Sequence, residues 1–202
     1  MRALRPGFVA MALALIAAPA SAAASPRAAT DAPPGIIGPP ELLEQGRAAQ
    51  RALAPLKQGL METLQAALAK SPAEAVGACQ LAAPGIAAGA STPAYTVGRT
   101  SDRLRNPKNA PEPWMEPLLA KYAAAPRDPL VGTVVALDGG AVGYVEPIHL
   151  KPLCTTCHGA AIEPGLAAEI RARYPEDRAT GYAEGDFRGL FWVVAKPASG
   201  ER

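Results

Sequence analysis

One pentapeptide, Cys154-Thr155-Thr156-Cys157-His158, constrains this chain more than any other part of the sequence. The CxxCH pattern is the attachment signature of c-type haem. Two thiols separated by two residues can reach both vinyl groups of one haem, and the histidine that follows is placed under the iron as an axial ligand. The chain has 3 cysteines and 2 histidines, so this concentration is poorly explained by chance. The sequence predicts one covalent haem c on Cys154 and Cys157, with His158 on the iron.

Three other uses of the motif compete with haem. A zinc site normally needs four nitrogen or sulfur ligands, so His149 or Cys79 would have to join the motif. Adjacent Cys157 and His158 are, however, an awkward pair around a tetrahedral ion. A redox dithiol would begin a helix in a βαβ unit, whereas this motif follows Lys-Pro-Leu and precedes a glycine. A structural disulfide requires only an oxidising compartment. Haem explains the complete motif, including its histidine.

The N-terminus predicts the export that haem attachment to CxxCH requires in bacteria. Arg2 and Arg5 form a positive segment, residues 8–18 are apolar, and Ala20-Ser21-Ala22 matches an A-x-A cleavage site. The apolar run is shorter than the ~20 residues of a membrane span. We therefore expect a signal peptide over residues 1–22, a periplasmic protein, and no stable membrane insertion after cleavage.

The charge of the mature chain argues against a nucleic-acid partner. Cleavage would remove two of the 20 basic residues and none of the 18 acidic ones, which leaves a formal net charge of zero. There is no basic stripe, and aromatic residues make up only 5% of the chain, so stacking platforms for bases are scarce. The remaining length suits one domain.

Residue patterns predict an Ala/Pro-rich linker over residues 23–40, followed by a single domain over residues 41–202. Leucines at three- and four-residue steps predict a helix that Pro55 divides, and Ser71 begins a second helix that Pro84 interrupts or ends. Asp138-Gly139-Gly140 predicts a hairpin turn. The expected helices are 41–70, 72 to about 84, 113–124 and 164–174, and the expected strands are 94–97, 131–137, 141–150 and 190–195. Helices that precede a mixed region with an antiparallel sheet indicate an α+β fold.

The second axial ligand of the iron is not decided by these patterns. Cys79 is the odd cysteine of an exported chain, which suits a ligating thiol, yet a buried and inert cysteine explains it equally well. His149 is the spare histidine. Because it lies only five residues before Cys154, the attachment peptide confines it to the proximal side, and a strand histidine is the better interpretation.

Several ordered motifs resemble the Tll0287-like haem proteins, a family long known only as a domain of unknown function. Residues 98–107 (GRTSDRLRNP), with Asn109 and Pro111, resemble the family signature RTSxxLRNPxNxP. Further matches are the segments KPLCTTCHG, YPEDRATGY and EGDFRG, and Cys79 with the APGIA that follows it at residues 83–87. The resemblance covers roughly residues 41–196. The final strand, residues 190–194, carries bulkier side chains than family members often do.

The resemblance implies N-terminal helices packed on a PAS-like antiparallel sheet, covalent haem c, and axial ligation by His158 and Cys79. Arg99 and Arg105 are candidates for binding the haem propionates, since guanidinium groups suit carboxylates. The competing interpretation is that Arg105 and its neighbours organise a loop through local hydrogen bonds.

A thiolate ligand favours ferric iron and a low potential, so we expect a sensor of redox state or of a diatomic gas, with an unidentified redox or signalling partner. The alternative is a periplasmic electron-transfer cytochrome c. A haem enzyme such as a peroxidase or nitrogen-oxide reductase is less favoured, because it needs an open iron position and a distal acid–base group, for which His149 is the only spare histidine.

Overall fold

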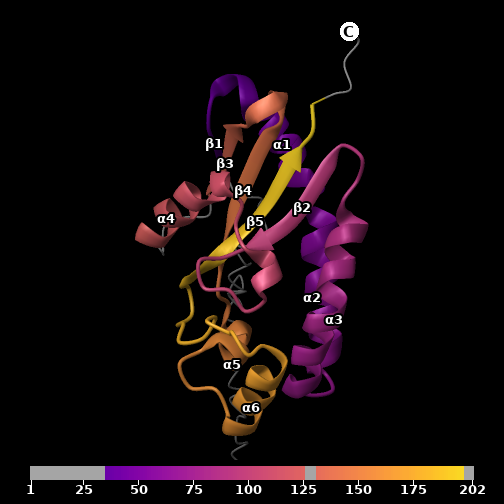
Figure 1. Ribbon diagram of the computed structural model, residues 1–202, viewed down its shortest axis with the longest axis vertical. Coiled ribbons are helices and arrows are strands. Elements are labelled where there is room, and N and C mark those ends of the chain that lie inside the picture. Colours follow the sequence, from indigo (N-terminus) through magenta and orange to yellow (C-terminus); the bar gives the residue numbers. More distant parts are fainter. Residues whose placement is uncertain (1–34, 126–130, 198–202) are drawn as a thin grey trace, which may run out of the picture. The chain divides into compact units, whose positions relative to one another are not determined.

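Five strands of the described residues form one sheet, in the order β1-β3-β4-β5-β2 (Figure 1). The computed structural model describes residues 35–125 and 131–197, so the predicted signal peptide lies outside it. All neighbouring strands pair antiparallel except β1, which runs parallel to β3. The strands are Gly35–Ile37 (β1), Tyr95–Thr100 (β2), Val131–Ala136 (β3), Val142–His149 (β4) and Phe187–Ala195 (β5).

Three long helices precede most of the sheet, which confirms the predicted α+β fold with N-terminal helices. The helices of the described part are Leu43–Ala52 (α1), Ala54–Leu68 (α2), Pro72–Ala90 (α3), Glu116–Ala124 (α4), Thr155–His158 (α5) and Pro164–Arg173 (α6). None of the described helices is long and apolar enough to cross a lipid bilayer.

Part of the predicted linker over residues 23–40 forms the N-terminal edge strand of the sheet. Residues 35–37 form β1 and pair with Val131–Thr133, and a 3-10 helix over Pro40–Leu42 leads into α1. Ile36 also packs against the main core. The linker prediction is therefore wrong at its C-terminal end, because composition alone does not reveal the pairing of a Pro- and Gly-rich segment with a distant strand. Residues 23–34 lie outside the described part.

The first predicted helix is divided where Pro55 required it. α1 ends at Ala52, Leu53 links the two helices, and Pro55 lies at the start of α2. Proline is tolerated there because the first residues of a helix have no intrahelical acceptor for their N–H groups. The break leaves Leu53 fully buried, so the sequence pattern predicted both the division and the inward face.

Helix α3 begins as predicted and ends later than predicted. The Ser71 side chain accepts a hydrogen bond from the Glu74 backbone N–H at 3.1 Å, as in a capping box. Pro84 lies inside the helix, which continues to Ala90. Ile86 and Ala87, in the following turn, pack against the main core. Their burial offsets the local cost of proline, which is a tertiary effect that residue propensities do not contain.

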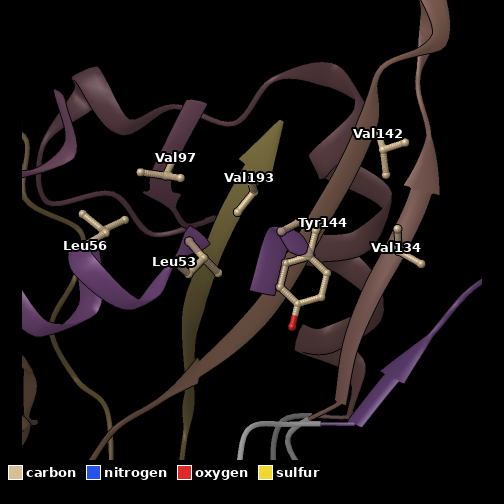
Figure 2. Close-up of a cluster of buried hydrophobic side chains, with 8 residues drawn as sticks. Leu53, Leu56, Val97, Val134, Val142, Tyr144 and Val193 are labelled. Atoms are coloured by element: carbon tan, nitrogen blue, oxygen red, sulfur yellow. The ribbon is translucent and has the colours of Figure 1, made fainter. Parts of the chain in front are cut away.

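The main core lies between helices α1 and α2 and one face of the sheet (Figure 2). Leu53 and Leu56 from the helices meet Val97, Val193 and Tyr144 from three strands. The opposite face is covered by α4 and the turn before it, where Trp114, Leu118 and Tyr122 pack against the sheet. These are the residues that helical periodicity predicts on one side of the segment.

The short helix α5 and helix α6 lie together at one end of the sheet, where β4 ends and β5 begins (Figure 1). Helix α3 runs beside α6, and the contact is apolar: Val76 of α3 packs with Leu166, Ile170 and Tyr174 of the α6 region. This contact brings the N-terminal part of α3 to the end of the sheet that carries the CxxCH motif.

Candidate cofactor site

The CxxCH motif forms a single helical turn immediately after β4. A 3-10 helix over Pro152–Cys154 leads into α5, which ends at His158 before Gly159. The Thr155 hydroxyl donates to the Pro152 carbonyl at 2.7 Å and supports the turn. Residues three and four positions apart lie on one face of a helical turn, so the two cysteines and the histidine share a face. All three side chains are half-buried.

His158 is held in one orientation by a backbone carbonyl. Its Nδ1 lies 2.6 Å from the Ala179 oxygen, so Nδ1 donates and Nε2 keeps its lone pair. Desolvation, and after it the positive charges of Arg105 and Arg188, lower the pKa of His158 to about 3. The imidazole is therefore neutral at pH 7, which is the form that binds a metal.

The segment that carries Ala179 is joined to the CxxCH turn by its backbone. The Tyr182 N–H donates to the His158 carbonyl at 3.0 Å, and the Gly181 N–H donates to the Gly159 carbonyl at 2.9 Å. Gly159 and Tyr182 form an isolated parallel bridge. The motif over residues 174–182 thus holds the end of the CxxCH turn and orients its histidine.

Arg105 joins three segments of the site. Its guanidinium makes a two-pronged contact with Asp177, at 3.2 Å from Nε and 3.0 Å from Nη2, and Nη2 also donates to the Cys157 carbonyl at 2.6 Å. The Arg105 and Asp177 side chains are only 13% and 6% exposed. Asp177 in turn accepts from the Ala179 N–H at 2.9 Å. Arg105 therefore has a structural role in the site, and its contact with a propionate stays a prediction.

Cys79 lies in α3, on the side that approaches the CxxCH turn. Its thiol is free and half-buried, and Val76, one turn earlier, packs in the same cluster as Cys157. Burial raises the pKa of Cys79, while Arg99 and Arg105 oppose that rise, and the charge of Cys79 acts on the pKa of Cys157. The fold thus brings the third cysteine into electrostatic range of the motif.

Arg99 approaches the same region from the sheet. It lies in β2 directly opposite Phe191 of β5 and is half-buried. Desolvation lowers the pKa of Arg99, which the charge of Cys79 partly opposes. No residue in the described part makes a hydrogen bond or an ion pair with its guanidinium. Arg99 is therefore a cation that lies beside Cys79 and pairs with no described carboxylate.

Reasoning from the sequence did not assign a role to Arg188, Arg103 or Tyr182. The guanidinium carbons of Arg103 and Arg188 lie 4.1 and 5.6 Å from the centroid of the Tyr182 ring. Among the described side chains, the Tyr182 hydroxyl and the Arg188 Nε are the buried polar atoms without a hydrogen-bond partner. These residues belong to the quoted family motifs, but no local spacing rule indicates that they meet.

The structure also shows the surroundings of His149 and the state of the cysteines, which bear on the zinc and disulfide alternatives. The His149 ring packs against Phe187, with centroids 6.2 Å apart, at the end of β4, as expected of a strand histidine. Within residues 35–125 and 131–197, no three His, Cys, Asp or Glu side chains gather as they would around a metal ion. All three cysteines are free thiols.

The donors present fit a covalently held haem. Two thiols and a neutral imidazole share one helical turn, and the imidazole has Nε2 free for iron. A third thiol approaches from α3, and two buried polar atoms nearby lack partners. Haem iron requires only axial donors from the protein, so a cluster of three or more metal-binding side chains is not needed.

Comparison with known proteins agrees with this geometry. The family model described as Tll0287-like matches residues 40–195. The crystal structure of the cyanobacterial heme-protein Tll0287 is similar to the chain, with 25% sequence identity and a TM-score of 0.53. The match covers 81% of this chain and 100% of that one. The comparison with curated proteins gave no match.

Proposed function

Because the chain belongs to the Tll0287-like family, we propose that it is an exported haem c protein of the periplasm that senses redox state or a diatomic gas. Cys154 and Cys157 hold the haem as thioethers, His158 binds the iron through Nε2, and Cys79 is the second axial ligand. A solved relative of the chain is itself described as a heme-protein, which supports the cofactor assignment.

The observation that carries the proposal is the fixed, neutral His158 inside the CxxCH turn. Hydrogen bonding of Nδ1 to the Ala179 carbonyl fixes the tautomer and presents Nε2. Desolvation keeps the ring uncharged. Iron ligands that are oriented by a second hydrogen bond in this way are typical of functional metal sites. The adjacent cysteines supply the covalent attachment.

Ligation by Cys79 is supported by its approach to the motif from α3. The contact between α3 and α6 sets this position, and Arg99 supplies a positive charge beside the thiol. A bound thiolate donates electron density and favours ferric iron, so the potential of the iron is low. Loss of Cys79 from the iron on reduction would open a position for a gas, which is the basis of the proposed sensing.

The haem assignment is tested on the full-length chain, expressed with its leader in a host that attaches haem c. A haemochrome spectrum and the mass of the intact protein should report one covalent haem. Wild type that lacks covalent haem under conditions where a reference cytochrome c receives it would overturn the assignment.

Cys79 ligation and sensing are tested in the same preparation. Cys79→Ala should change the ferric low-spin bands, whereas the control Met61→Ala, at an exposed position, should not. A redox titration with and without CO then separates the two functions. A sensor binds CO after reduction, whereas an electron carrier with closed ligation cycles reversibly and does not bind it.

A further inference from the structure

Two buried polar atoms beside the CxxCH turn are without partners in the described part of the chain: the Tyr182 hydroxyl and the Arg188 Nε. Buried polar groups in folded proteins are almost always hydrogen-bonded. An unpaired buried donor therefore indicates a partner other than these protein residues. Here the two donors belong to neighbouring side chains, since the Arg188 guanidinium lies 5.6 Å from the centroid of the Tyr182 ring.

Both residues are held in place by contacts that leave these donors unused. The Arg188 Nη1 donates to the Arg103 carbonyl at 3.2 Å, and the Arg188 carbonyl accepts from the Ser101 hydroxyl at 2.8 Å. The Tyr182 backbone N–H donates to the His158 carbonyl. The Tyr182 backbone is therefore fixed next to the residue that we assign to the iron, and the Arg188 guanidinium lies against the Tyr182 ring.

Among the described residues, the carboxylates do not balance the guanidinium groups around the CxxCH turn. Three guanidinium groups, those of Arg99, Arg105 and Arg188, lie close enough together to interact electrostatically. Asp177 pairs with Arg105, whereas Arg99 and Arg188 form no ion pair with any described residue. Two half-buried cations thus lack a carboxylate counter-ion among the described residues. Half-buried cations are normally paired because desolvation penalises a lone charge, so the site fits a ligand with two negative charges.

We propose that Arg188 and Tyr182, together with Arg99, bind the two propionate carboxylates of the haem. The inference rests on the proposed haem c function. Guanidinium and hydroxyl donors suit carboxylates, and two carboxylates match the two unpaired cations. Arg105 already holds Asp177 and the CxxCH backbone, whereas Arg188 and Tyr182 each have a buried donor that is unused. These are positioning residues that set the charge and hydrogen bonding around the cofactor.

Covalent attachment makes the proposal testable, since loss of a propionate contact leaves the haem in place. The variants are Arg188→Gln, Arg99→Gln, Arg188→Lys and Tyr182→Phe, with Arg171→Gln as the control because Arg171 is exposed on α6. The measurements are the midpoint potential as a function of pH and the resonance Raman band of propionate bending.

Arg188→Gln and Arg99→Gln should each lower the midpoint potential, because loss of a nearby positive charge favours ferric iron. We expect about a tenfold change in the ferric-to-ferrous ratio at a fixed potential, which is about 59 mV for one electron. Arg188→Lys retains the charge and should stay near wild type. Tyr182→Phe should move the pH-dependent step upward, since a carboxylate that loses a donor is protonated more easily.

The inference is overturned if Arg188→Gln and Arg99→Gln match Arg171→Gln in potential and Tyr182→Phe leaves the propionate band unchanged. Equal loss of potential in Arg188→Gln and Arg188→Lys would indicate a structural role and also overturn it. If Arg188→Gln does not fold, Tyr182→Phe and Arg188→Lys decide through the Raman band. Absence of covalent haem from wild type would instead refute the proposed function, so the two failures are distinguishable.

Discussion

The Nδ1 atom of His158 lies 2.6 Å from the carbonyl oxygen of Ala179, 21 residues further along the chain. This contact links the CxxCH turn to a segment that Arg105 and Asp177 hold in place. A histidine whose Nδ1 is committed in this way presents only Nε2 to a metal. The orientation of the proposed iron ligand therefore depends on an ion pair outside the motif.

Replacement of Arg105 by Gln should lower the free energy of unfolding by about 3 to 5 kcal/mol, because the buried Asp177 carboxylate would lose its cation. Urea denaturation measures the change. The control is Arg47→Gln, whose ion pair with Glu44 has side chains 52% and 70% exposed and should contribute less than about 1 kcal/mol. Equal effects of the two substitutions would contradict the structural role of Arg105.

Cys154→Ala and Cys157→Ala should each leave a single thioether, and the double variant should carry no covalent haem, because each thiol bonds to one vinyl group. Haem staining after denaturation and the haemochrome band position measure this. Cys79→Ala is the matched control and should retain both thioethers. Covalent haem in the double variant would show that the attachment residues are assigned incorrectly.

Leu53→Ala should destabilise the protein by about 2 to 5 kcal/mol, because Leu53 is fully buried where α1 and α2 meet the sheet. The same substitution at Leu81, which is 78% exposed, should change stability by less than about 0.5 kcal/mol. Both are measured by chemical denaturation. A large effect at Leu81 would mean that this side chain is covered in solution.

Pro84→Ala should stabilise the protein by about 1 kcal/mol, because alanine restores a backbone donor inside α3 and removes a helix-interior proline. The gain is reduced by the greater entropy of the unfolded chain. Pro55→Ala is the control, since Pro55 lies at the start of α2, where no intrahelical bond is recovered. Similar gains at both positions would argue against the continuous helix through Pro84.

The local elements were predictable wherever one short stretch contained all of the relevant information. The Ser71 cap, the helix break before Pro55 and the Asp138–Gly140 turn each depend on neighbouring residues. The errors arose where distant contacts outweighed local preference. Packing of Ile86 carries α3 past Pro84, and pairing with Val131–Thr133 makes residues 35–37 a strand.

The candidate site likewise has one part that the sequence predicted and another part that it did not. The spacing of Cys154, Cys157 and His158 was readable because covalent geometry alone sets how a single turn presents them. The function of Arg105 was harder to predict: its partners are Asp177 and the Cys157 carbonyl, and nothing near Arg105 in the sequence distinguishes an arginine that binds protein from one that binds a ligand.

The sequence by itself determined the chemistry of the CxxCH turn, because the bonds between adjacent residues permit few arrangements of side chains only three or four positions apart. The tertiary structure alone decided what surrounds that turn. The packing of α3 on α6 brings Cys79 near it, the sheet presents Arg99, and the segment over residues 174–186 supplies the Ala179 carbonyl and Tyr182. These contacts between distant segments depend on the summed burial of many side chains, which no local pattern encodes.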